Sequence, residues 1–203
     1  TTMNPGTRTL LQVRVEDARF LTGNGTYIDD VNLPRQAIAV IKRAELAHAR
    51  ILKLDISAAR TAPGVLLVVT GNEWVAAGYG AIPCRTPVRT NIDGSPFKEP
   101  VRHCLATDTV RQVGEPIALV VAETAAQARH AADLVEVDYD QLPAVADPVK
   151  ALGGDAAQLW PGIPGNLCLD FSLGDAKAVD AAITAAAHVV RLTVVNNRVT
   201  AVA

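Results

Sequence analysis

The residues of this chain that could act as catalytic groups rarely stand at the spacing that catalysis requires. His48, Asp55 and Ser57 are the three residue types of a hydrolase triad and lie close together in the sequence. No Gly-x-Ser-x-Gly turn surrounds the serine, however, so the sequence does not predict a hydrolase. His48, in the stretch LAHARI, is the best single candidate for a catalytic base. The alternative, which we favour, is a histidine that holds a turn through its hydrogen bonds.

A carboxylate follows a glycine in the stretch Val-Gly-Glu-Pro at residues 113–116. Glu115 could act there as a general acid or base. The simpler interpretation is that Gly114 permits an unusual backbone angle, that Glu115 caps or pairs, and that Pro116 opens a strand at its edge. His48, Gly114 and Glu115 are therefore weak functional candidates, and the sequence assigns a catalytic role to none of them.

Metal and cofactor sites have little support in the sequence. The cysteines are odd in number, widely spaced and without a Cys-x-x-Cys pair, which argues against a disulfide framework, a zinc site or an iron–sulfur site; they are Cys84, Cys104 and Cys168. The histidines show no ligand spacing; they are His48, His103, His130 and His188. The Gly-Asn-Gly of residues 23–25 lacks the flanking strand and helix of a nucleotide loop. Asp29 and Asp30 fit a turn, because adjacent carboxylates on an extended chain point in opposite directions. We expect no catalytic, cofactor-binding or metal-binding residue in this chain.

The composition fits a globular protein with an aliphatic core. Hydrophobic residues make up 49% of the 203 residues and charged residues 20%, while aromatic residues make up only 4%. Val, Ile, Leu and Ala must therefore fill the core. The net charge of −2 and the absence of a basic stripe argue against nucleic-acid binding. No apolar run is long enough for a secretion signal or a membrane span. Because the cysteines do not suggest a disulfide framework, we expect a reducing, cytoplasmic environment.

The hydrophobic pattern predicts strands joined by helices. Alternation or short apolar runs predict strands at 36–44, 49–57, 65–70, 115–122, 135–140 and 188–199. Short helices are predicted at 57–62 and 72–77, and longer helices follow Thr124 and Asp175, which can serve as N-caps. The continuous apolar run at 65–70 is typical of a strand buried on both faces. Residues 78–100 are rich in Gly and Pro without periodicity, so they predict a long loop.

The stretch from Val110 to Val145 contains the clearest element order. A strand, an alanine-rich helix and a second strand follow one another closely, and the crossover would be right-handed if the strands were parallel in one sheet. Val120, in the middle of the first strand, should be fully buried. Residues 1–30 carry turn residues and predict irregular chain, and residues 151–171 predict another irregular connection.

Taken in order, four segments of the chain resemble the N-terminal region of one enzyme family. They are RVEDARFLTGNGTYIDDVNLP (14–34), AELAHARILKLDISAARTAPGVLLVVTG (44–71), VRQVGEPIALVVAETAAQARHAADLVEVDYDQLPAVADPVKAL (110–152) and DAAITAAAHVVRLTVVNNRV (180–199). The family is that of the molybdopterin-binding large subunits of xanthine dehydrogenase, aldehyde oxidase and carbon monoxide dehydrogenase. Two local departures stand out: Arg43-Ala44-Glu45 replaces a usual Arg-Ser-Pro, and Arg35 stands where the family commonly has glycine.

The resemblance implies an α+β fold, the α/β hammerhead, with a mixed sheet and packed helices. It divides the chain into an irregular arm (1–34), the hammerhead domain (35–150) and a linker, helix and strand (151–203) that lead toward a molybdopterin-binding domain. The family's cofactor loops and its catalytic glutamate lie in later domains, so the chain is expected to be one domain or a separate subunit. In either case we expect the isolated chain to be inactive.

The complete enzyme implied by the resemblance oxidises an aldehyde, an N-heterocycle or CO. Its cofactors would be molybdopterin or molybdopterin cytosine dinucleotide, two [2Fe–2S] clusters and FAD. The expected partners are the molybdopterin-binding domains and the iron–sulfur and FAD subunits, not nucleic acid or membrane. This chain would then be a structural and assembly domain. The alternative is a stand-alone binding module that uses residues 78–100 for a small ligand or partner.

A domain taken from such an enzyme should expose apolar surface. Two candidates are the segment 20–34, with Phe20, Leu21 and Tyr27, and the last predicted strand, with Val194, Val195 and Val199. We expect self-association through one of them, foremost through the last strand, because an unpaired edge is a template for pairing. The alternative is a mobile C-terminus, if the last strand finds no partner.

Overall fold

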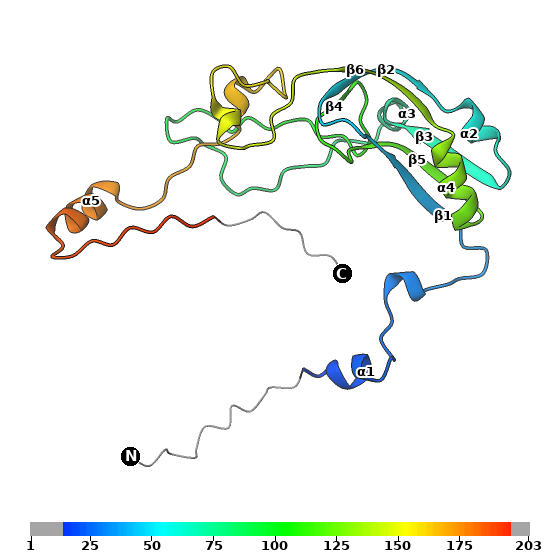
Figure 1. Cartoon of the computed structure of the whole chain (residues 1–203), viewed down its shortest axis with the longest axis horizontal. Coiled ribbons are helices and arrows are strands. Elements are labelled where there is room, and N and C mark those ends of the chain that lie inside the picture. Colours follow the sequence, from blue (N-terminus) through cyan, green and yellow to red (C-terminus); the bar gives the residue numbers. More distant parts are fainter. Residues whose placement is uncertain (1–13, 196–203) are drawn as a thin grey trace, which may run out of the picture. The chain divides into compact units, whose positions relative to one another are not determined.

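The helices and strands of the chain lie mainly between residues 38 and 141. Figure 1 shows a computed structural model, which describes residues 14–195. The elements are α1 (Asp17–Leu21), β1 (Ile38–Arg43), β2 (Ala49–Asp55), α2 (Ser57–Thr61), β3 (Val65–Thr70), α3 (Gly71–Ala76), β4 (Thr109–Val110), β5 (Pro116–Ala122), α4 (Ala125–Asp133), β6 (Glu136–Gln141) and α5 (Ala176–Ala185). Single 3-10 turns occupy Ile28–Asp30, Lys150–Leu152 and Pro164–Asn166.

The chain divides into two compact units. The first unit contains residues 1–81 and 103–144, and the second contains residues 82–102 and 145–203. All the strands found in residues 14–195 belong to the first unit. The predicted strands other than the last are present within one or two residues of their expected bounds, as are the helices after residues 56, 70, 124 and 175.

Two three-stranded sheets form the first unit. The first sheet has the order β1-β5-β3 and the second has the order β4-β2-β6. Every pairing in the described part of the chain is antiparallel, which corrects the expected mixed sheet. The strand–helix–strand unit of β5, α4 and β6 connects the two sheets rather than two parallel strands of one sheet. The α+β fold itself is confirmed.

The core lies between the first sheet and two helices. Val40, Val120 and Val68 face one another across β1, β5 and β3. Alanines of α4 and α2 pack on this face, which lets the helices approach the strands closely; the fully or nearly buried ones are Ala59, Ala131 and Ala132. Figure 1 shows α4 lying along β5 and β1, the two strands with which it makes most of its contacts. Val120 has no exposed surface, as predicted.

Strand β3 is an edge strand, which corrects the prediction that it is buried on both faces. Leu66 and Leu67 remain 58% and 50% exposed, and only Val68 is buried. A register shift between Val65 and Leu67 accompanies this exposure. An apolar run shows that a strand is hydrophobic, but burial of both faces also requires elements on both sides of the sheet.

The chain before β1 is less irregular than predicted. Residues Asp17–Leu21 form the short helix α1, and the Arg14 side chain donates to Asp17 Oδ1 at 3.0 Å. Arg35 adopts a φ of +60°, in the left-handed region where glycine carries no steric cost. A glycine at this position, as the resembling family commonly has, would therefore fit the observed turn.

The predicted strand at 188–199 is wrong within the described residues. Helix α5 begins after Asp175, whose carboxylate accepts the hydrogen bond of Ala178 N at 2.9 Å, as predicted. Residues 188–195, however, take part in no strand pairing, and residues 196–199 lie outside the described part. Apolar alternation favours an extended backbone, but a strand also needs a neighbour to receive its hydrogen bonds.

In the described residues of the second unit, side-chain hydrogen bonds join the segments and no sheet is present. Residues 78–100 contain no helix or strand, apart from an isolated bridge between Thr90 and Pro96, so the predicted loop is confirmed. The Asn91 side chain donates to Ser95 O and accepts the hydrogen bond of Asp170 N at 2.6 Å. Asn91 thereby joins the loop to the segment that follows residue 145.

No helix in residues 14–195 combines the length and the hydrophobicity that crossing a bilayer requires.

Candidate functional site

The turn between β4 and β5 contains two of the three candidate residues. Gly114 has a φ of +82°, and its N–H donates to Ala44 O at 2.7 Å. The Glu115 carboxylate accepts the hydrogen bond of Arg111 N, and Ala44 N donates to Glu115 O at 2.8 Å. Arg43 closes the contact by donating to Gly114 O at 2.8 Å. The arrangement binds the end of β1 to the start of β5, and the Glu115 carboxylate faces a backbone amide.

Replacing Gly114 by Ala should lower the free energy of unfolding by about 1–2 kcal/mol, because a Cβ is strained at this φ. The space around a Cβ at this position is open, so strain is the whole cost. Gly114→Asn is the matched variant, and it should cost less because Asn adopts the left-handed region more readily. Urea unfolding followed by circular dichroism measures both. Equal stability of Gly114→Ala and the unchanged chain would contradict the assigned strain.

His48 is buried and bonded to the backbone. Its exposed fraction is 6%, and its Nδ1 atom lies 2.7 Å from Pro143 O. The His48 carbonyl also accepts the hydrogen bond of Leu142 N at 2.9 Å. These contacts join the start of β2 to the chain that follows β6. They are the contacts that a structural histidine would make, and the role of His48 stays a prediction.

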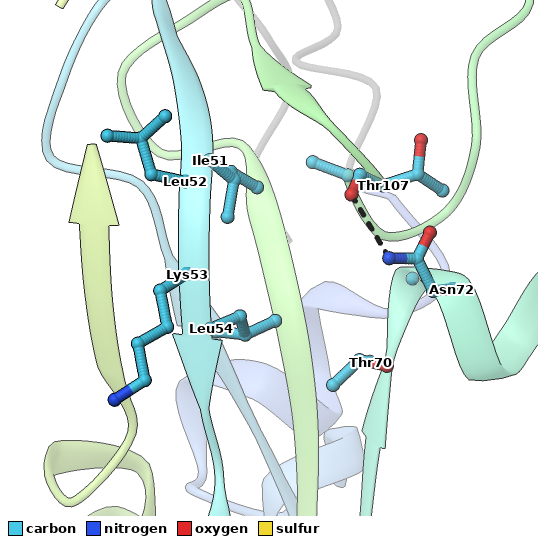
Figure 2. A pocket seen from close by; sticks show the side chains of 9 residues that line it. Ile51, Leu52, Lys53, Leu54, Thr70, Asn72 and Thr107 are labelled. Atoms are coloured by element: carbon cyan, nitrogen blue, oxygen red, sulfur yellow. Dashed lines mark hydrogen bonds between the residues drawn. The ribbon is translucent and has the colours of Figure 1, made fainter. Parts of the chain in front are cut away.

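A cleft of about 210 Å³ lies beside β2, β3 and the start of α3. Figure 2 shows Ile51 and Leu54 pointing toward Thr70, Asn72 and Thr107, while Leu52 and Lys53 point the other way. Asn72 donates to Thr107 O at 3.4 Å, and the Thr70 hydroxyl is bonded to Glu73 Oε2. The cleft therefore presents aliphatic side chains, and these two polar groups are engaged in local hydrogen bonds.

Charged groups near the cleft are held in local pairs. The hydrogen bond from Ser57 N to Asp55 Oδ1, together with Lys53 Nζ at 3.2 Å from Asp55, lowers the pKa of Asp55 to about 2. The hydrogen bond from Thr70 N, together with Arg60, lowers the pKa of Glu73. Both carboxylates stay ionised at neutral pH, so neither is poised to exchange a proton there.

The described residues do not fit a metal or an iron–sulfur cluster. Within residues 14–195, no group of three or more His, Cys, Asp or Glu side chains could hold a metal ion. Cys84, Cys104 and Cys168 are free thiols, and burial raises the pKa of Cys168. The Asp30 carboxylate accepts the hydrogen bond of Tyr27 N at 2.9 Å, a turn contact rather than a ligand position.

Sequence reasoning missed two buried polar atoms in the first unit. Trp74 Nε1 and His103 Nδ1 have no hydrogen-bond partner among the described residues. Trp74 packs against Tyr79, with ring centroids 4.5 Å apart. The sequence does not predict that these two ring nitrogens are buried, because the burial of a single ring atom depends on tertiary packing.

Among the described contacts, none joins His48 to Gly114 or Glu115. His48 joins β2 to the chain after β6, whereas Gly114 and Glu115 join β1 to β5. Each candidate contacts backbone groups, and each lies where two distant segments of the first unit meet. The geometry is that of connections between strands.

Comparisons with known proteins agree with this architecture. Residues 22–143 match the family described as aldehyde oxidase and xanthine dehydrogenase, a/b hammerhead domain. The chain is 39% identical over 192 residues to the nicotine 6-hydroxylase large subunit of Paenarthrobacter nicotinovorans, covering 92% of this chain and 22% of that protein. It is 38% identical over 146 residues to the carbon monoxide dehydrogenase large chain of Afipia carboxidovorans, and this match covers 72% of this chain and 17% of that protein.

Solved structures extend the agreement to the fold. Reconstituted CO dehydrogenase from Oligotropha carboxidovorans superposes with a TM-score of 0.67 at 32% identity, covering 87% of this chain and 22% of that chain. Quinoline 2-oxidoreductase from Pseudomonas putida 86 superposes with a TM-score of 0.62 at 39% identity, and the match covers 71% of this chain and 17% of that chain. The chain spans about a fifth of the length of these relatives. It belongs to the α/β hammerhead family of aldehyde oxidases and xanthine dehydrogenases.

Proposed function

We propose that this chain is a non-catalytic structural and assembly domain in the large subunit of a molybdenum hydroxylase. The observation that carries the proposal is the hammerhead match over residues 22–143, in relatives of which the chain spans about a fifth. The described polar candidates support it, because His48, Gly114 and Glu115 connect strands through backbone contacts. Within the chain, residues 35–150 would form the domain body, between an arm at 1–34 and a linker at 151–203.

The complete enzyme would oxidise an aldehyde, an N-heterocycle or CO in the cytoplasm. It would carry molybdopterin, or its cytosine dinucleotide form, on other domains of the large subunit. Two [2Fe–2S] clusters and FAD would lie on partner subunits. The support is that one relative is named as a subunit of a dehydrogenase complex and that a solved neighbour is named as a Cu,Mo-CO dehydrogenase.

Two preparations test this proposal. The isolated 203-residue chain should bind less than about one tenth of an equivalent of molybdenum, iron or flavin, because the described residues form no ligand cluster. Capture from the native cells with an antibody against the domain should instead yield molybdenum, iron and FAD together with further polypeptide. Elemental analysis, flavin fluorescence and mass spectrometry measure these quantities.

The native preparation also separates the proposal from its alternative. A species without molybdenum, iron or FAD would contradict the enzyme-domain proposal and favour a stand-alone binding module. Stoichiometric molybdenum on the isolated chain would contradict the non-catalytic role instead.

A further inference from the structure

One face of the first sheet carries only apolar side chains in its two central rows. The register places residues of β1, β5 and β3 side by side; the rows are Ala39, Val121 and Leu67, and then Ile41, Leu119 and Val69. Because side chains alternate along a strand, these six residues share the face opposite Val40, Val120 and Val68. We call these six residues the bare face.

The bare face is open to solvent. Ile41 and Leu67 are 38% and 50% exposed, Ala39 is exposed, and the other three are half-buried. Helices α2 and α4 pack in the cluster of Val68 and Val120, which belongs to the opposite face. A contiguous apolar face at the centre of a sheet is typical of a surface that another protein surface covers.

Opposite charges mark the two ends of the bare face. Arg43 ends β1 beyond Ile41, and Glu123 follows β5 beyond Val121. Both side chains are exposed, and neither has an ion-pair partner within the described range. Arg43 Nη1 donates a hydrogen bond to Gly114 O, and the other N–H groups of the guanidinium can still donate to an acceptor on another molecule. Arg43 follows a register shift after Lys42, and Glu123 lies in the bend that follows β5, so the two charges lie at opposite ends of the bare face, outside its strand rows.

We propose that the bare face binds a second copy of this chain, face to face, around a two-fold axis perpendicular to the strands. This axis reverses the strand direction in the second copy. Arg43 of each copy then faces Glu123 of the other, so the ion pair forms twice, as two-fold symmetry requires. Apolar rows would fill the centre and the charges the rim, which is the usual anatomy of a protein interface. This inference goes beyond the proposed function and does not depend on it.

Sedimentation of the 203-residue chain tests the proposal over a range of ~1 to ~200 µM. The chain should sediment as a dimer at the upper end. Ile41→Asp should raise the dimer dissociation constant by about 100-fold or more, because an unpaired carboxylate would enter the apolar centre. Leu52→Asp is the matched control: Leu52 is 67% exposed on the second sheet, and its replacement should leave the constant unchanged.

Charge reversal tests the orientation. Arg43→Glu should weaken the dimer about tenfold, and Arg43→Glu with Glu123→Arg should restore it. Thermal unfolding of each variant at low concentration verifies that it is folded. A chain that stays monomeric throughout the range overturns the proposal and leaves the bare face for a further domain of a larger subunit. A dimer that resists Ile41→Asp also overturns it and assigns the contact to another surface, such as residues 20–34.

Discussion

A chain with Asp in place of Val120 should not fold. Val120 has no exposed surface and lies in the central strand of the first sheet, between Val40 and Val68 and beneath α4. The cluster around it is entirely apolar, so a carboxylate there would have no partner. Burying it costs an amount comparable to the whole stability of a small domain, about 5–15 kcal/mol. Soluble yield and the cooperative thermal transition measure the outcome.

Two control variants separate charge from loss of volume. Val120→Ala should fold and lose about 2 kcal/mol of unfolding free energy, because it removes buried methyl groups without adding charge. Leu66→Asp, at a site 58% exposed on the neighbouring strand, should change stability by less than about 0.5 kcal/mol. A soluble Val120→Asp protein with a cooperative transition would show that the first sheet is not the core.

Gly71→Ala should destabilise the chain by about 3 kcal/mol or more. Gly71 is buried at the first position of α3, where a Cβ would lie 2.3 Å from Ala106 O and 2.7 Å from Leu105 O. Both contacts are with backbone atoms, which cannot rotate away as a side chain could. Either α3 or the segment before β4 must therefore move. Urea unfolding measures the loss.

The sign of this effect is informative, because alanine in place of a helical glycine without such contacts usually stabilises by about 1 kcal/mol. Gly80→Ala is the matched control: Gly80 has no heavy atom within 4 Å of its Cβ position, and its φ lies outside the left-handed region. It should therefore change stability little. If Gly71→Ala were as stable as the unchanged chain, the close approach of α3 to Ala106 would be refuted.

The elements that the sequence predicted well are those with local causes. Strand β5 is an apolar run between a glycine turn and a helix cap, and α4 starts where the Thr124 hydroxyl accepts the hydrogen bond of Gln127 N. Gly114 is similar, because its φ of +82° follows from the needs of one turn. Backbone angles and caps depend on a few neighbouring residues, so the sequence contains them directly.

The features that the sequence predicted poorly depend on contacts between residues far apart in the chain. Strand β4 has two residues and exists through its pairing with β2, at Ala49 and Arg50. The apolar run of β3 is half exposed because helices α2 and α4 pack on the face that carries Val68, whereas Leu67, on the other face, stays 50% exposed. His48 meets Pro143, 95 residues later. Strand order and such contacts are properties of the whole fold, and hydrophobic periodicity carries no information about which strands become neighbours.

The order of the first sheet has a consequence for synthesis of the chain on the ribosome. Strand β5 lies between β1 and β3, yet it is the last of the three to be made. From Arg43, which ends β1, to Ala122, which ends β5, the ribosome adds 122 − 43 = 79 residues. At about 5–20 residues per second, β1 waits roughly 4–16 seconds for its partner. During that interval, the apolar residues of β1 and β3 are available to chaperones and to other nascent chains.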